Sequence, residues 1–244
     1  MFSQTKIKPI VYPDSDGQPM SDNTKQFDWI SSIKGELGVM FTDNPDVFVA
    51  GDLLWYPVEG HPEIRIAPDA LVAFGRPKGD RGSYKQWEEN GIAPQVVFEV
   101  LSPGNRASEM ARKLEFYDRY GVEEYYIIDP DRADLTGYYR SQAHEPLRLI
   151  DDLTIWQSPR LSIRFGIEHE EVRIYRPDGR AFVAFEEIGR LHLEALAMLK
   201  AERVKAEQER QKAEQERQKA EQERQKAERL AAQLRALGIE PESE

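Results

Sequence analysis

The stretch QVVFEVLSPGNRASEMARKLEFYDRYGVEEYYIID, residues 95–129, decides the fold. It contains two short apolar runs rich in β-branched and aromatic residues, separated by a segment with helical spacing, about residues 107–120, that Gly121 closes. A strand, a helix and a second strand in this order form a right-handed crossover with parallel strands. The sequence therefore predicts an α/β domain built around this unit.

Glu99 lies in the middle of the first apolar run. Alternation along a strand places it on one face with Val97 and Leu101, while the other face also carries only apolar residues. A buried carboxylate is costly unless it is paired, hydrogen-bonded or bound to a metal. Two interpretations follow: a partner in the core satisfies Glu99, or Glu99 belongs to a functional site.

The rest of the chain predicts one further helix and several strands. Apolar residues at helical intervals run from Asn23 to about Phe41, and Glu36 lies on this helix. Further runs typical of strands are DVFVAGDLLWY, EIRIAPDALVAF, LTGYYR, EPLRLI and EVRIYRPDGRAFVA. A leading helix followed mostly by strands indicates a mixed β-sheet flanked by helices.

The C-terminal segment is repetitive. AEQERQK occurs three times in succession, starting at residues 206, 213 and 220, and its residue types favour one long helix. The heptad pattern gives a weak seam, because alanine alternates with glutamate until leucines appear near the end. Two alternatives stay open: a single solvated helix, or a loose coiled coil that makes the chain a homo-oligomer.

These patterns divide the chain into three parts. We expect an N-terminal extension over residues 1–22, a folded domain over residues 23–190 and a charged helical tail over residues 191–244.

The composition excludes several classes of protein. The sequence has no cysteine, which excludes disulfides, thiolate catalysis and cysteine-ligated metal sites. It shows neither the apolar region of a signal peptide nor a run of about 18 apolar residues, so we expect a cytoplasmic protein without a membrane span. The tail from residue 200 is neutral, and the net charge of −11 belongs to residues 1–199. An acidic domain disfavours strong, non-specific binding to a phosphate backbone.

Two further residues are candidate partners of Glu99. Asp69 follows Pro68 and enters the apolar run ALVAF, so it lies at the edge of the core. Two carboxylates on neighbouring strands form a site typical of Mg²⁺, which one or two carboxylates commonly hold. On the helix after Glu99, Lys113 lies within the apolar stripe, so it is directed towards the sheet. A lysine there can position a water or stabilise charge on a phosphate.

The ordered series from Pro68 and Asp69 to VVFEVLSPGNRASEMARKLEFYDRYGVEEYYIIDPD resembles the Uma-two family of restriction endonucleases, a branch of the PD-(D/E)XK nuclease superfamily. The similarity covers about residues 23–176. It implies a restriction-endonuclease-like fold and an endonuclease that hydrolyses phosphodiester bonds in DNA with Mg²⁺, for which Mn²⁺ substitutes.

The resemblance also assigns roles to residues. It makes Asp69 and Glu99 the motif acids that hold the metal. The superfamily's lysine would stand at position 101, where this chain has Leu101; such families are thought to move it to the following helix, which matches Lys113. Glu36 resembles an accessory acid found on the first helix of some members.

A second functional class stays open beside the enzyme. The chain would then be a catalytically inactive protein of the same fold that acts as a binding or assembly module through its tail. In that case a core partner satisfies Glu99, and Lys113 extends to solvent from the edge of the apolar stripe. The loop GRPKGDRGSYKQW, residues 75–87, is either a solvated loop or the phosphate-facing rim of the cleft.

Overall fold

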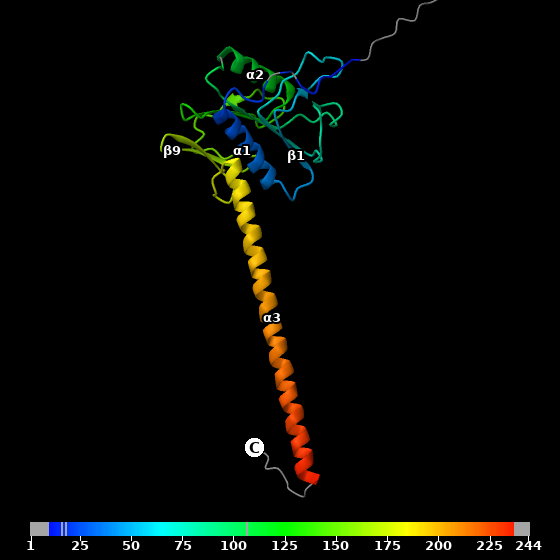
Figure 1. The fold of residues 1–244 in the computed structure, drawn as a ribbon. Coiled ribbons are helices and arrows are strands. Elements are labelled where there is room, and N and C mark those ends of the chain that lie inside the picture. Colours follow the sequence, from blue (N-terminus) through cyan, green and yellow to red (C-terminus); the bar gives the residue numbers. More distant parts are fainter. Residues whose placement is uncertain (1–9, 16, 18, 106, 237–244) are drawn as a thin grey trace, which may run out of the picture. The chain divides into compact units, whose positions relative to one another are not determined.

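A six-stranded mixed sheet forms the centre of the fold (Figure 1). The structure, a computed structural model, describes residues 10–15, 17, 19–105 and 107–236. Only the β5–β6 pair is parallel within this sheet; its other neighbouring strands are antiparallel. The strands, in their order across the sheet, are β1 (Val47–Gly51), β3 (Ala70–Phe74), β5 (Val96–Val100), β6 (Glu124–Asp129), β7 (Asp134–Tyr139) and β8 (Arg148–Leu149).

The crossover predicted from residues 95–129 is confirmed. Helix α2 (Ala107–Tyr120) connects β5 to β6, and Val97 pairs with Tyr125 in the parallel register. Gly121 ends the helix with a φ of 103°, a left-handed conformation that glycine adopts without steric cost. The mixed α/β fold with flanking helices is therefore as expected.

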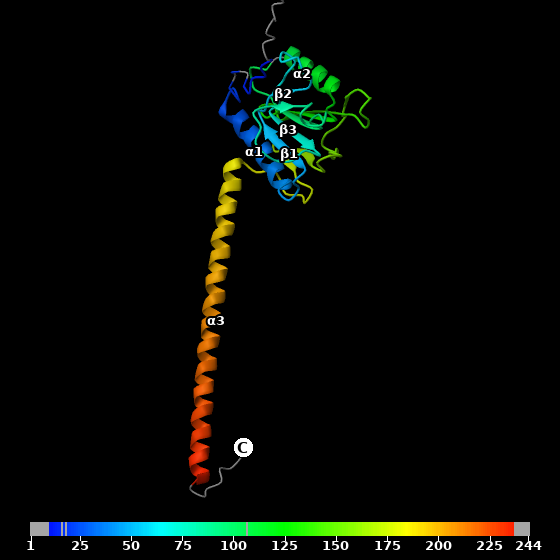
Figure 2. The same cartoon turned by 90° about the vertical axis from the view of Figure 1, so that its right-hand side faces the viewer.

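The two faces of β5 are covered by different helices, which explains why the strand is apolar on both. Helix α1 (Thr24–Met40) begins after Asn23, whose side chain accepts a hydrogen bond from the Gln26 backbone N–H at 2.9 Å. Its buried residues Ile33 and Leu37 belong to the same core cluster as Phe98. On the other face, Val97 packs in a second cluster with residues of α2. In Figure 2 the central strand β3 lies between α1 and α2.

Smaller elements depart from the predicted strands. The run DVFVAGDLLWY divides into β1 and β2 (Trp55–Tyr56), because Asp52 between them takes a left-handed φ of 48°. Strand β2 pairs in parallel with β4 (Tyr84–Lys85). The hairpin of β9 (Arg164–Glu168) and β10 (Glu171–Tyr175) includes one strand, β9, that the sequence did not predict.

The chain divides into two units, residues 1–187 and 188–244. The second unit is formed by most of α3 (Phe185–Ala236), a single helix of 52 residues whose repeats carry intrahelical ion pairs such as Arg210–Glu207 at 3.0 Å. No helix in the described ranges is long and apolar enough to cross a membrane. Part of the expected extension (residues 1–9, 16 and 18) and the end of the tail (residues 237–244) lie outside the described residues.

We propose that the domain and the tail are independent in stability. Deleting residues 201–244 should leave the melting temperature of the domain unchanged, because the deleted segment is nearly neutral and its described side chains are almost all exposed. The measurement is thermal unfolding of the truncated and full-length chains. Loss of a cooperative transition after truncation would show that the tail supports the domain.

Candidate active site

Asp69 directly precedes β3, and Glu99 lies on the neighbouring strand β5. Strands β3 and β5 are antiparallel with Ala70 opposite Phe98, and one further step along this register brings Asp69 to Glu99. Residues directly opposite in an antiparallel pair point to the same face. The backbone N–H of Val100 donates a hydrogen bond to Asp69 Oδ2 at 2.6 Å, which holds this carboxyl against the end of β5.

Helix α2 supplies two donors to Glu99 from one face. Lys113 and Tyr117 are four residues apart and therefore neighbours on the helix surface. Lys113 Nζ donates to Glu99 Oε2 at 2.7 Å, and the Tyr117 hydroxyl donates to Glu99 Oε1. Glu99 is 2% exposed, whereas the Lys113 side chain keeps 17% of its surface. The structure thus brings together three of the four predicted site residues: Asp69, Glu99 and Lys113.

Tyr117 is a contact of Glu99 that the sequence did not single out. It lies in the apolar stripe of α2, where the sequence pattern predicts that an aromatic residue packs in the core. The available signal was its polar end, because the hydroxyl of a buried tyrosine usually finds a hydrogen-bond partner. Glu99 was the buried acceptor on the facing strand. Burial, followed by the negative charge of Glu99, raises the pKa of Tyr117 well above its ordinary value, so the phenol stays a donor.

Burial and neighbouring charges shift the pKa of Asp69 and that of Lys113. Burial, and then the charge of Glu99, raise the pKa of Asp69 from 3.8 to about 8, although the Val100 hydrogen bond and Lys113 act in the opposite direction. Burial lowers the pKa of Lys113, but the charge and hydrogen bond of Glu99 raise it to above its ordinary value. At pH 7 Asp69 therefore keeps its proton and Lys113 its charge.

The donor set fits a hard divalent cation. Asp69 holds a proton beside a second carboxylate, and a cation between the two would favour the ionised form instead. Within the described ranges no group of three or more His, Cys, Asp or Glu side chains could hold a metal ion. Two protein carboxylates with water in the remaining positions are nevertheless a common Mg²⁺ arrangement.

Glu36 does not join this site. It lies on α1, which covers the opposite face of β5, and it is fully buried. Its Oε2 pairs with Arg176, and its Oε1 accepts a hydrogen bond from the Val183 backbone N–H at 3.0 Å. The residue of α1 that reaches the end of β5 is Gln26, whose Nε2 donates to the Val100 carbonyl at 2.7 Å.

The basic loop after β3 has partners within the domain. Arg76 and Arg81 both pair with Glu89, Arg76 at 2.8 Å, and their side chains are largely buried. Lys78 donates to the backbone carbonyls of Phe41 and Thr42. These contacts give the three residues a structural role, and the loop is a weaker candidate for a phosphate-binding rim than its charge suggests.

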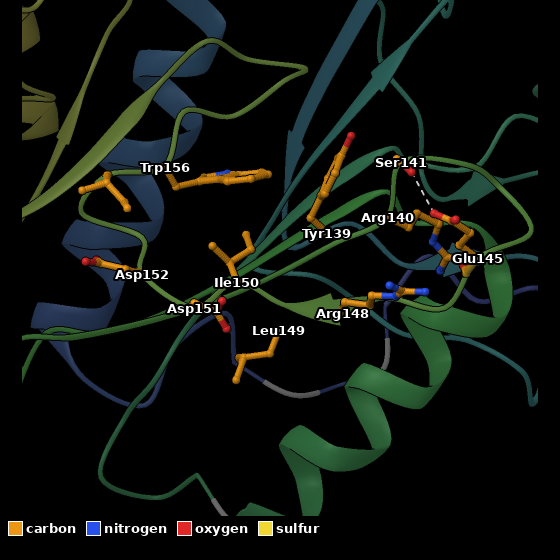
Figure 3. Close-up of a pocket in the computed structure, with 11 residues that line it drawn as sticks. Tyr139, Arg140, Ser141, Glu145, Arg148, Leu149, Ile150, Asp151, Asp152 and Trp156 are labelled. Carbon is orange, nitrogen blue, oxygen red and sulfur yellow. Dashed lines mark hydrogen bonds between the residues drawn. The ribbon is translucent and has the colours of Figure 1, made fainter.

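A separate cavity of about 550 Å³ lies towards the β8 edge of the sheet (Figure 3). Tyr139 and Trp156 stand close together in its wall, with ring centroids 5.1 Å apart, and Ser141 donates to Glu145 at 2.7 Å. In the strand register Tyr139 pairs with Glu124, which pairs with Val96. Because Val96 begins β5 and Glu99 lies near its end, the cavity is at the opposite end of the strands from Glu99.

Comparison with known proteins relates most of the domain to one family. The Uma2 family model, described as "Putative restriction endonuclease", matches residues 18–168. A second model, "Helicobacter pylori protein of unknown function (DUF874)", matches residues 190–236 of the charged helix. A search of curated proteins found no match.

One solved structure that the chain resembles is described as "a putative nuclease belonging to DUF820 from Anabaena variabilis ATCC 29413". The sequences are 15% identical, the match covers 64% of this chain and 87% of the other, and the TM-score is 0.43.

The raised pKa of Asp69 predicts a pH dependence of stability. Between pH 3.8 and about pH 8, the Asp69 carboxyl holds a proton in the folded protein but has lost it in the unfolded chain. This stabilisation is complete below the unfolded pKa and is lost as the pH rises through about 8. In EDTA the melting temperature should therefore fall over this range, and Asp69→Asn should remove that part of the decline. If the melting temperatures of the wild type and of Asp69→Asn fall equally with rising pH, the raised pKa does not belong to Asp69.

The position of Glu36 predicts a structural phenotype. Glu36→Gln should lower the free energy of unfolding by about 3 kcal/mol, because the buried ion pair with Arg176 is broken. The measurement is urea unfolding, and the change in melting temperature on addition of Mn²⁺ is the second readout. We expect that change to be the same in Glu36→Gln and in the wild type. A variant of normal stability that no longer responds to Mn²⁺ would place Glu36 in the site instead.

Proposed function

The chain belongs to the Uma2 family, described as "Putative restriction endonuclease", and from this premise we propose that it is a Mg²⁺-dependent endonuclease that hydrolyses phosphodiester bonds in DNA. The observation that carries the proposal is the convergence of two opposed carboxyl groups and one ammonium group at the ends of β3 and β5. Phosphoryl-transfer enzymes commonly combine carboxylate-held metal with a cation that meets the phosphate. The proposed setting is the cytoplasm.

Asp69 and Glu99 are the proposed metal ligands. Their oxygens are hard donors suited to Mg²⁺, with Mn²⁺ as a substitute. When bound, such a cation polarises a phosphoryl oxygen and lowers the pKa of a coordinated water. Asp69 has to lose its proton to bind a cation, so occupancy should improve as the pH approaches its pKa of about 8.

Lys113 is the proposed catalytic cation. An ammonium group has three N–H donors, and the pair with Glu99 uses one of them. The other two can hold an attacking water or an oxygen of the phosphate in reach of the carboxylates. Lys113 keeps a fixed positive charge close to Glu99, and such preorganised charge stabilises the negative charge that develops on a phosphate under attack.

A second candidate function has its own supporting observation. Both oxygens of Glu99 already accept hydrogen bonds within the domain, which is also the pattern of a carboxylate with a purely structural role. In that case the chain is a catalytically inactive module, and α3 provides an exposed surface for assembly, including association with a second copy through a coiled coil. The acidic charge of residues 1–199 also suits a protein that does not bind DNA strongly.

Substitution of Lys113 separates the two functions. Lys113→Met should reduce cleavage of plasmid DNA in Mg²⁺ by about 100-fold or more, the usual cost of removing a group that stabilises a transition state. The fold should persist at reduced stability, because the ion pair with Glu99 is lost while Met fits the apolar stripe and Tyr117 still donates to Glu99. Arg112→Met is the matched control, since Arg112 is the exposed neighbour of Lys113 on α2. Equal cleavage by both variants would remove Lys113 from the mechanism, and absence of cleavage by the wild type would favour the inactive module.

A further inference from the structure

The two donors that α2 presents to Glu99 differ in rigidity. Lys113 carries its ammonium group on a flexible four-carbon stem that can follow a moving carboxylate. Tyr117 carries its hydroxyl on a flat ring with only two side-chain torsions. The Tyr117 bond therefore specifies a position for Glu99 Oε1, whereas the Lys113 bond can accommodate several orientations of the same carboxylate.

The ring of Tyr117 is fixed by its surroundings. The side chain is fully buried. Its ring lies parallel to that of Trp55, with an angle of 2° and centroids 6.3 Å apart, and meets the Tyr125 ring edge-on at 4.8 Å. Trp55 is itself fully buried, and its indole N–H donates to Gln86 Oε1 at 3.1 Å. The ring of Tyr117 is therefore packed between two buried aromatic side chains while its hydroxyl donates to Glu99.

We propose that Tyr117 is a positioning residue that fixes the carboxylate plane of Glu99 and thereby sets the affinity of the Asp69–Glu99 pair for a divalent cation. This inference rests on the metal site of the proposed function. Its mechanistic consequence concerns Lys113. When the ammonium group turns its donors towards a phosphate or a water, the Tyr117 bond still holds Glu99 in place. Partners that orient a metal ligand commonly change metal affinity 10- to 100-fold when they are removed.

The chain offers a matched control for this role. Tyr125 is as deeply buried as Tyr117 and belongs to the same aromatic cluster. Its hydroxyl, however, lies 4.0 Å from Met110 Sδ, a weak acceptor. Tyr125→Phe removes a buried phenol hydroxyl from the same cluster without removing a donor from Glu99. Any effect common to both Tyr→Phe variants is therefore an effect of packing.

The experiment compares the wild type, Tyr117→Phe and Tyr125→Phe as full chains. Mn²⁺ affinity is measured by calorimetry in the absence of DNA, and kcat and KM are measured on plasmid DNA. We expect Tyr117→Phe to bind Mn²⁺ about tenfold more weakly than the wild type. Its kcat at fixed sub-saturating Mn²⁺ should fall while KM for DNA stays the same. Tyr125→Phe should match the wild type in all three quantities.

The outcomes distinguish this inference from the proposed function. Mn²⁺ binding by the wild type with the same affinity in Tyr117→Phe would overturn the role of Tyr117 and leave the metal site standing. Absence of Mn²⁺ binding by the wild type would overturn the metal site and this inference with it. If Tyr117→Phe does not fold, Trp55→Phe takes its place, because it loosens the ring of Tyr117 and keeps the hydroxyl. Unchanged Mn²⁺ affinity in that variant would also overturn the inference.

Discussion

The burial of the Glu99 carboxylate between the sheet and α2 constrains the rest of the domain. Its two oxygens need donors, and Lys113 and Tyr117 provide them only if α2 docks with this face against β5. The strand register is constrained in the same way. A slip of one residue would turn Glu99 towards α1 and place it among Ile33 and Leu37, without either donor. The pairing of β5, the rotation of α2 about its axis and the position of Asp69 are therefore set together.

The sequence predicted those parts of this arrangement that depend on local periodicity. The alternation of β5 gave the face of Glu99, and the helical spacing of α2 gave the direction of Lys113, because both periods are fixed by backbone geometry. The placement of Glu36 depends instead on Arg176, a residue 140 positions away. No local pattern reports such a contact. The contact of Tyr117 with Glu99 was not predicted for a different reason: the same side chain packs in the core and donates a hydrogen bond.

The surface charge of the loop after β3 also could not be predicted from the sequence alone. The loop after β3 is basic in sequence, but Glu89 from the following segment accepts from both of its arginines. Arg81 also lies over the ring of Phe48, with its guanidinium carbon 3.9 Å from the centroid. Arg81 thus connects the loop to β1 through internal contacts. The charge that a partner molecule would meet depends on such internal pairing and cannot be obtained by counting residues.

The repeats of α3 make its length adjustable without other change. Each AEQERQK unit contains two acidic and two basic residues, so adding or removing one leaves the net charge as it was. Seven residues of α-helix extend about 10.5 Å and turn through nearly two full turns. A gain or loss of one unit would lengthen or shorten the rod by a fixed increment and present almost the same side. Duplication or loss of one repeat within the gene would therefore change the length of α3 without changing its net charge.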